Sequence, residues 1–154
     1  MESIVQLITP KKATHYILDT ATIRQALEKF DAHKFSVVPL LDKNGRYAGT
    51  LSEGDILRYV KNNANFDIEI AENVLVKDIE HYRPYRCLKI DATIEEVYAL
   101  ALDQNFVPLV DDRDFYIGII KRKDWIRFKR ASSLRSVNQR PPRMPSKEPC
   151  LNDA

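Results

Sequence analysis

The sequence predicts an α/β (α+β) protein built from two pseudo-symmetric strand-helix-strand-strand-helix units that pack through their sheets. Three observations predict this fold. The middle of the chain contains an internal sequence repeat of two copies. Within each copy, segments with helical spacing of apolar residues alternate with segments of strand spacing, and turn residues separate them. The copies are offset by 71 positions at the first matched pair and by 69 at the other two. The matched segments are 20–27 with 91–98, 37–42 with 106–111, and 49–55 with 118–124. A unit of this size does not bury its apolar face alone, so the copies are expected to fold together.

Residues 1–12 are predicted to form an N-terminal helix that leads into the first copy. Ile4, Val5, Leu7 and Ile8 have helical spacing, and Pro10 should end the helix because proline lacks a backbone N–H.

The first copy, residues 13–63, opens with a short strand at 16–18. Thr22 is the expected N-cap of the following helix. Apolar residues then recur at i, i+3, i+4 and i+7, which marks one face of that helix: Ile23, Ala26, Leu27 and Phe30.

The rest of the first copy is predicted to be a hairpin and a helix. The apolar run 35–41 has the length of a buried strand, and 42–45 supplies the turn residues before a returning strand at 47–51. The helix 54–63 should turn three side chains inward: Ile56, Leu57 and Val60.

The second copy, residues 85–131, repeats this order of elements. A strand is expected at 88–90, and a hairpin at 106–110 and 116–120. Thr93 is the expected cap of the first helix, with Ile94, Val97 and Ala101 inward, and Trp125 and Phe128 belong to the last helix.

Two stretches lie outside the copies. Residues 64–84 form a linker in which Val74, Val76 and Ile79 indicate a short helical turn. The stretch 132–154 is predicted to be a flexible basic tail, because 140–149 holds four prolines and no periodicity.

Composition narrows the class of protein. Two cysteines, Cys87 and Cys150, make no metal or redox spacing, and no apolar run is long enough to span a membrane. The N-terminus lacks the features of a signal peptide, so a cytoplasmic protein is expected. Residues 121–154 carry a net charge of +7 and the remainder −5. A basic end of this kind is typically a solvated face or tail, and the tail 132–154 has no aromatic residue to stack on bases, which argues against nucleic-acid binding.

The order of the motifs resembles a known family. Thr-Ile before a helix, an apolar strand containing Val-Pro, and Gly-x-x-Ser-x-x-Asp at a helix start are similar to the cystathionine-beta-synthase (CBS) domain. Two copies in tandem resemble a CBS pair, or Bateman module, over roughly residues 10–130. The resemblance implies a stand-alone regulatory sensor that binds an adenine nucleotide, takes no cofactor, pairs as a homodimer and acts on a target protein whose identity is unknown.

The resemblance also implies a ligand site in the first copy. Ser52 and Asp55 match the family's contacts to ribose and phosphate, at a helix N-terminus that favours an anion. The alternative is that Ser52 caps the helix and Asp55 completes its capping box. The adenine slot of the family falls on two segments of the first copy: Thr14 and His15, and Phe35, Ser36, Val37 and Pro39. Val37 and Pro39 can equally be core residues, and His15 a surface residue.

The second copy departs from the motif at the corresponding place. Lys121 stands where the first copy has Ser52, followed by Arg122, Lys123 and Asp124. Cations at a helix N-terminus oppose the helix dipole, so they are expected either to neutralise phosphates of a ligand or to form a solvated basic turn. Arg122 and Lys123 align with the phosphate-binding residues of a subgroup that resembles this chain and binds cyclic di-adenosine monophosphate; AMP, ADP and ATP remain compatible.

No catalytic pair or metal cluster stands out in the sequence, so no enzymatic activity is expected. The alternative function is a scaffold module that binds no ligand and contacts a partner protein through its basic end.

Overall fold

The computed structural model describes residues 3–139 and contains two units of the predicted order. The predicted proline-rich segment 140–149 lies outside the described residues. The first unit consists of β2 (Ile17–Leu18), α1 (Ile23–His33), β3 (Val37–Leu41), β4 (Tyr47–Ser52) and α2 (Glu53–Asn62). The second consists of β5 (Leu88–Lys89), α4 (Ile94–Ala101), β6 (Phe106–Val110), β7 (Tyr116–Lys121) and α5 (Arg122–Gln139). The predicted fold class is therefore confirmed.

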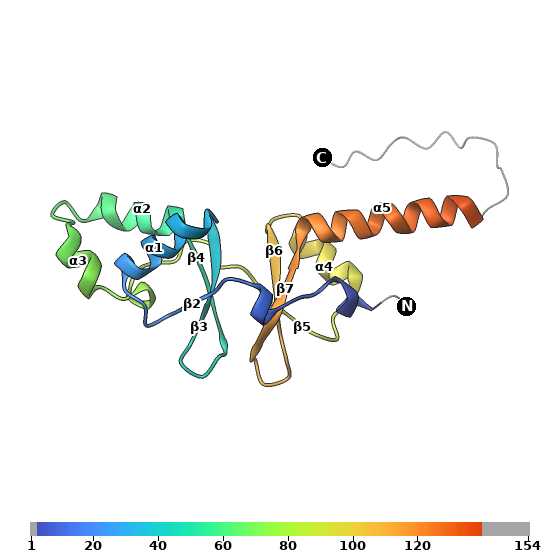
Figure 1. Cartoon of the computed structure of the whole chain (residues 1–154), viewed down its shortest axis with the longest axis horizontal. Coiled ribbons are helices and arrows are strands. Elements are labelled where there is room, and N and C mark those ends of the chain that lie inside the picture. Colours follow the sequence, from blue (N-terminus) through green and yellow to red (C-terminus); the bar gives the residue numbers. More distant parts are fainter. Residues whose placement is uncertain (1–2, 140–154) are drawn as a thin grey trace.

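Each unit has one sheet, and the sheets lie in the middle of the molecule with the helices outside them (Figure 1). In each sheet a short parallel pair precedes an antiparallel hairpin: β2 with β3 and then β4, and β5 with β6 and then β7. The two hairpins touch, because the backbone N–H of Tyr116 donates to the carbonyl of Gly45 at 3.0 Å and that of Tyr47 to the carbonyl of Asp114 at 3.1 Å.

The beginning of the chain crosses to the second unit. Strand β1 (Thr9–Pro10) pairs antiparallel with β7, so the segment that follows is carried between the two units. The predicted N-terminal helix is reduced to a single 3-10 turn, Ile4–Leu7. Proline at position 10 disfavours helical backbone in the residue before it. Ile8 is extended, and Thr9 and Pro10 pair with β7 instead.

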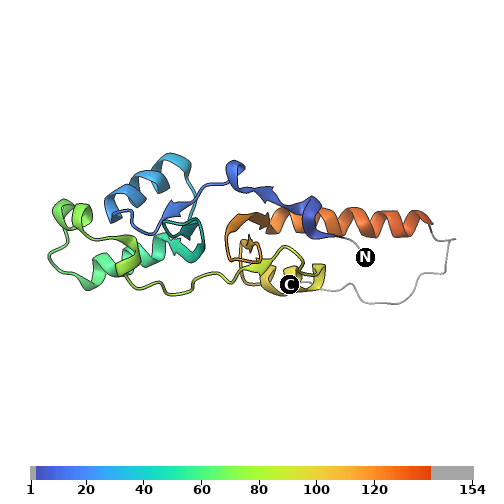
Figure 2. The same ribbon diagram turned by 90° about the horizontal axis from the view of Figure 1, so that it is seen from below.

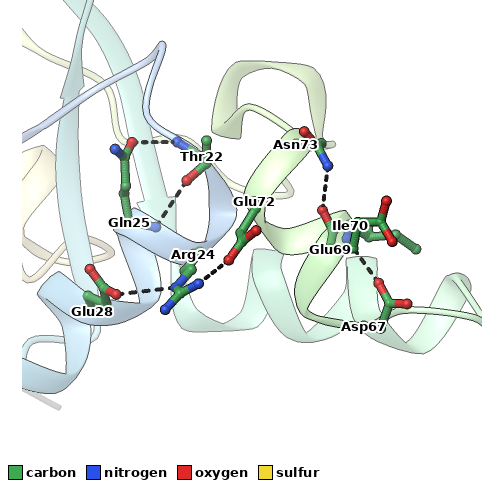
Figure 3. Close-up of polar contacts among 9 residues, drawn as sticks. All are labelled: Thr22, Arg24, Gln25, Glu28, Asp67, Glu69, Ile70, Glu72 and Asn73. Atoms are coloured by element: carbon green, nitrogen blue, oxygen red, sulfur yellow. Dashed lines mark hydrogen bonds and ion pairs between the residues drawn. The ribbon is translucent and has the colours of Figure 1, made fainter.

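Local sequence explains where the helices begin. The predicted caps Thr22 and Thr93 both form complete capping boxes, in which each threonine hydroxyl accepts from the third backbone N–H of its helix. In the linker, Asp67 caps the short helix α3 (Ile68–Asn73), and a 3-10 turn follows at Val76–Asp78. Figure 3 shows that Arg24 of α1 binds Glu72 of α3, which attaches the linker helix to the first unit.

Apolar burial forms one core in each unit and a third cluster between them. The middle cluster contains Leu41 of the first unit and Phe106, Tyr116 and Ile119 of the second, each at most 9% exposed. Burial of these side chains from both sheets provides the main driving force for joining the units. Of the side chains predicted to point inward from α2, Ile56 is buried but Leu57 is 69% exposed, which corrects that prediction.

Helix α5 extends further than its sequence pattern indicates. It was expected to end near Ser132 and continues to Gln139. The residues beyond Phe128 are mostly polar, so apolar spacing could not mark this end, although serine, arginine and glutamine are tolerated in exposed helices.

Candidate functional site

A cleft of about 530 Å³ opens between the two units, at the ends of strands from both sheets. Its volume is in the range of small-molecule sites. The first unit and its leading segment contribute Ala13, Thr14, His15, Phe35, Val37, Val38 and Pro39. The second unit contributes Asn105, Phe106, Ile119, Lys121, Arg122, Lys123 and Ile126. One wall is therefore largely apolar and aromatic, and the other carries three consecutive cations.

The aromatic wall is held by the segment that follows β1. The hydroxyl of Thr14 donates to the carbonyl of Lys11 at 2.7 Å and accepts from the hydroxyl of Tyr116 at 2.8 Å, which fixes the segment to β7. The next residue, His15, stacks on His33 with ring centroids 4.0 Å apart and lies 5.7 Å from the ring of Phe35. These rings offer flat surfaces of the kind on which a nucleobase stacks.

The cationic wall is formed where β7 ends and α5 begins. Lys121 has no acceptor atom, so it cannot cap the backbone N–H groups of the first helical turn as a serine would. Arg122 is anchored, because its Nε donates to the carbonyls of Ala101 at 2.7 Å and Gln104 at 3.1 Å. Among the described residues its two terminal nitrogens have no such partner, and the residue lines the cleft. The wall combines a held guanidinium and two ammonium groups at the start of a helix, which together suit a phosphate.

The positive charge of the cationic wall affects His15 on the opposite side of the cleft. The pKa of His15 lies below its usual value, mainly because burial disfavours the charged ring, and further because the positive charges of His33, Lys29 and Lys121 repel it. An anion in the cleft would remove part of this repulsion.

Ser52 and Asp55 do not line this cleft, which corrects the expectation that they share one site with the adenine slot. They form the capping box of α2: the serine hydroxyl accepts from the N–H of Asp55 at 3.1 Å, and the carboxylate accepts from the N–H of Ser52 at 2.9 Å. The carboxylate of Asp55, only 4% exposed, also accepts from the N–H of Tyr82 at 2.9 Å and faces Arg58 at 3.5 Å. The capping alternative therefore describes their observed contacts.

The linker covers this junction of the first unit. The Arg58 guanidinium lies 4.0 Å from the ring centroid of Tyr82, and the ring of His81 lies between the carbonyls of Thr50 and Val76 at 3.1 and 2.7 Å. The equivalent junction in the second unit faces the cleft with Lys121 instead. The two junctions thus differ in what lies over them as well as in sequence.

The geometry follows from the pseudo-two-fold packing of the copies. The start of the hairpin in one copy faces the strand-helix junction of the other, so the cleft combines Phe35 and Val37 with the segment 121–123. The predicted residues Ser36 and Asp124 lie beside the cleft rather than in its wall: the carbonyl of Ser36 accepts from the N–H of Glu53, and Asp124 pairs with Arg127 at 3.6 Å.

Several lining residues were missed in the sequence. Asn105 and Phe106 occupy the positions in the second copy that Ser36 and Val37 occupy in the first, so the repeat itself was the signal that pointed to them. Three more gave no such signal: Val38, Ile119 and Ile126.

Comparison with known proteins identifies the family. A model of the CBS domain matches residues 7–62 and 76–131, so the chain belongs to the CBS domain family and carries two copies in tandem. Among solved structures with a similar fold are CbpB in complex with c-di-AMP, with a TM-score of 0.78 and 22% identity, covering 90% of this chain and 91% of that one. CBSX2 in complex with AMP is similar with a TM-score of 0.69 and 22% identity, covering 86% of this chain and 99% of that one.

One relative found by sequence similarity is named as an enzyme. A homoserine O-acetyltransferase of Methanohalophilus mahii is 31% identical over 99 residues, which covers 64% of this chain and 19% of the relative. The chain spans about a fifth of the length of the curated relatives it matches.

Within residues 3–139 no cluster of three or more histidine, cysteine, aspartate or glutamate side chains is placed to hold a metal ion. Helices long and apolar enough to cross a membrane are also absent from this part of the chain.

Proposed function

We propose that this chain is a non-catalytic regulatory module that binds an adenine nucleotide in the cleft between its CBS domains and signals the bound state to a partner protein. The observation that carries the proposal is that two different walls face each other across one cleft. The aromatic wall holds His15 and Phe35, and the cationic wall holds Lys121, Arg122 and Lys123. A planar base and a negatively charged phosphate require these two kinds of surface at one site.

In the proposed complex the base lies against His15 and Phe35 with Val37 and Pro39 behind it, and the phosphates meet the segment 121–123. Support comes from structures of similar fold solved with c-di-AMP and with AMP. Thr14 shapes the slot through its bonds to Lys11 and Tyr116 rather than by a free hydroxyl. Ser52 and Asp55 are left out of this complex, because the contacts of their side chains are made within the first unit and to its linker.

Among adenine nucleotides we favour cyclic di-AMP, because three adjacent cations suit two phosphates better than one. AMP, ADP or ATP in the same cleft is the competing ligand. A competition titration separates them: unlabelled AMP or ATP should displace a labelled cyclic dinucleotide only at higher concentration than unlabelled cyclic di-AMP. Displacement at equal or lower concentration would make the mononucleotide the preferred ligand.

A thermal-shift panel tests the function itself. A ligand that binds only the folded chain raises its melting temperature, so adenine nucleotides should stabilise it at concentrations well above Kd. Adenosine should stabilise it less, because it lacks phosphate, and guanine nucleotides serve as the base control. If no nucleotide shifts the transition, the alternative of a scaffold module without ligand is favoured. Acetyl transfer is not proposed, since the acetyltransferase match covers 19% of the relative's length.

Binding should depend on pH through His15. Its pKa in the free cleft lies below the usual value, and a phosphate nearby should raise it. The complex then binds more protons than the free chain, so affinity should increase as the pH falls toward and below about 6.5. We expect a roughly three- to tenfold gain between pH 8 and pH 6, measured by calorimetry with a cyclic dinucleotide because its phosphodiesters do not change charge in this range. His15→Gln should flatten the profile, and an unchanged slope in this variant would exclude the histidine as the cause.

We also propose that the chain forms a homodimer. Large apolar side chains remain exposed on helices of both units, including Leu57 at 69% and Ile126 at 52%, and such surfaces typically mark interfaces. Trp125 and Phe128, on the same helix as Ile126, are half-buried within their own chain. Light scattering should give the mass of two chains at tens of micromolar, and the mass of one chain would reject the dimer.

A further inference from the structure

The repeat relates the cleft to a second place between the two units, which we call the twin position, where each copy supplies what the other supplies to the cleft. The offset of 71 positions places Tyr85 there in the role of Thr14. The hydroxyl of Tyr116 in the second unit bonds to that of Thr14 at 2.8 Å. The hydroxyl of Tyr47, 69 positions earlier in the first unit, donates to the carbonyl of Tyr85 at 2.5 Å. Figure 2 shows the two segments that carry these residues, blue and yellow-green, crossing between the units on opposite sides of the molecule.

The ring of Tyr85 occupies the twin position. It lies edge to face with the ring of Phe106, with centroids 4.9 Å apart. Its hydroxyl accepts from the backbone N–H of Asn105 at 3.3 Å. Both contacts lie at the start of the hairpin of the second unit, and the equivalent residues of the first unit are Ser36 and Val37, beside which the base is proposed to lie. A tyrosine ring therefore stands in the second unit where a base is proposed to stand in the first.

Buried polar groups hold the backbone on both sides of this ring. The N–H of Tyr85 donates to the hydroxyl of Thr50 at 2.8 Å. The side chain of Gln104 accepts from the N–H of Arg86 at 2.9 Å and donates to its carbonyl at 3.1 Å. Thr50 is 2% exposed and Gln104 6%, so each would lose a protein partner without gaining water if this segment left. The ring is therefore held in place by its backbone as well as by its own contacts.

The linker also covers the helix start at the twin position. The segment 52–54, where β4 passes into α2, is the repeat equivalent of the cationic segment 121–123. The backbone N–H of Tyr82 donates to the buried carboxylate of Asp55 at 2.9 Å, and the guanidinium of Arg58 lies 4.0 Å from the centroid of the Tyr82 ring. Residues 82–85 thus contact both halves of the twin position, as a nucleotide is proposed to span both walls of the cleft.

We infer that residues 82–85 are an intramolecular occupant of the twin position, in which the Tyr85 ring takes the place of a base and closes the position to ligands. One residue of the repeat makes the difference, because Thr14 has no ring and lines an open cleft. Without the Tyr85 ring, the twin position should accept a planar aromatic molecule that carries a hydroxyl. The inference goes beyond the proposed function and does not depend on it, since the twin position is not the proposed nucleotide site.

Phenol, which replaces the atoms that Tyr85→Ala removes, tests this closure directly. In the full chain, Tyr85→Ala should lower the melting temperature by about 5–10 °C, because a buried ring is lost and a cavity is left. Phenol at roughly tenfold above its Kd should then raise the melting temperature of this variant by about 3 °C or more, relative to its effect on the unmodified chain. Tyr98→Ala is the matched control, because Tyr98 is 47% exposed and its loss leaves no enclosed space. If phenol acts equally on both variants, the ring does not fill a site.

Amide chemical shifts show where phenol binds. In Tyr85→Ala, phenol should shift the backbone N–H resonance of Asn105, because the added hydroxyl can accept from that group as the tyrosine hydroxyl does. Tyr85→Phe keeps the ring and loses only this bond, so phenol should leave its spectrum unchanged. Shifts of Tyr85→Ala confined to the first cleft, around residues 13–15 and 35–39, would contradict the assignment.

Nitration of the unmodified chain tests the inference even if Tyr85→Ala does not fold. With limiting tetranitromethane, Tyr82 and Tyr98, which are 56% and 47% exposed, should be modified first. Tyr85 should react roughly tenfold more slowly or less, because its ring must leave the twin position before the reagent reaches it. Mass spectrometry of the digested chain measures the three rates, and a rate for Tyr85 equal to that of Tyr82 overturns the inference. None of these measurements uses a nucleotide, so their failure is distinguishable from failure of the proposed function.

Discussion

Arg122→Ala is expected to weaken nucleotide binding by roughly ten- to a hundredfold, while the affinity for adenosine changes little. The guanidinium is held at the cleft by bonds from Nε to the carbonyls of Ala101 and Gln104, so an arriving phosphate does not have to order this side chain. Calorimetric titration with a nucleotide and with adenosine measures the dissociation constants of both ligands, and their ratio shows how much of the loss is due to the phosphate. Affinity for the nucleotide should also fall as salt rises, since a partly exposed ion pair is screened.

The comparison with adenosine separates a phosphate contact from a structural role. Loss of the bonds to α4 can disturb the cleft, but that disturbance would reduce the binding of adenosine and nucleotide together. Arg113→Ala removes the same charge from an exposed position in the same unit and serves as the control. Equal losses for both ligands, or no loss for either, would contradict the assignment of Arg122 to the phosphates.

Gly118→Ala is expected to destabilise the fold by about 3 kcal/mol or more and to lower the melting temperature by about 10 °C. A Cβ at this position would lie 2.2 Å from the carbonyl oxygen of Thr9, a backbone atom in the paired strand β1, and 3.1 Å from Cγ2 of Ile8. Relief of that overlap requires β1 to leave β7. Because β1 carries Thr14 and His15 to the cleft, nucleotide affinity should fall as well.

Gly49 provides the matched control, because it occupies the same place in the first copy. It also has a positive φ, +113° against +153°, but a Cβ there meets only Pro84 Cβ at 3.6 Å, an ordinary contact. Gly49→Ala should therefore show the cost of backbone strain without the overlap. If the two variants melt at the same temperature, close packing of β1 on Gly118 is not what stabilises this edge of the sheet.

Much of the fold was predictable because its determinants are local. The capping boxes of Thr22 and Thr93 and the matched hairpins are set by residues within a few positions of each other. Strand β1 was not predictable, because it has two residues, one of them proline, and exists only through pairing with a strand more than a hundred positions away. The exposure of Leu57 likewise depends on what the surrounding chain leaves uncovered, which periodicity does not reveal.

The candidate site was predictable in part. His15, Phe35 and the segment 121–123 were named from a resemblance to the family, and the structure brings them to one cleft. Ser52 and Asp55 were placed there too because they match the family's contacts to ribose and phosphate at a helix N-terminus. In the structure, pseudo-two-fold packing pairs the slot of the first copy with the junction of the second, and a sequence states the order of the two copies but not how they face each other.

Photolabelling with an azido-adenine cyclic dinucleotide tests most directly where the ligand binds. After irradiation of the full chain, digestion and mass spectrometry should find the label on peptides that contain residues 13–16 or 35–39, and an excess of unlabelled cyclic di-AMP should prevent the reaction. Labelling concentrated on residues 50–60 or 82–88 would place the ligand at the first unit's own junction. That result, or labelling that the competitor does not block, would contradict a nucleotide site in the cleft between the two CBS domains.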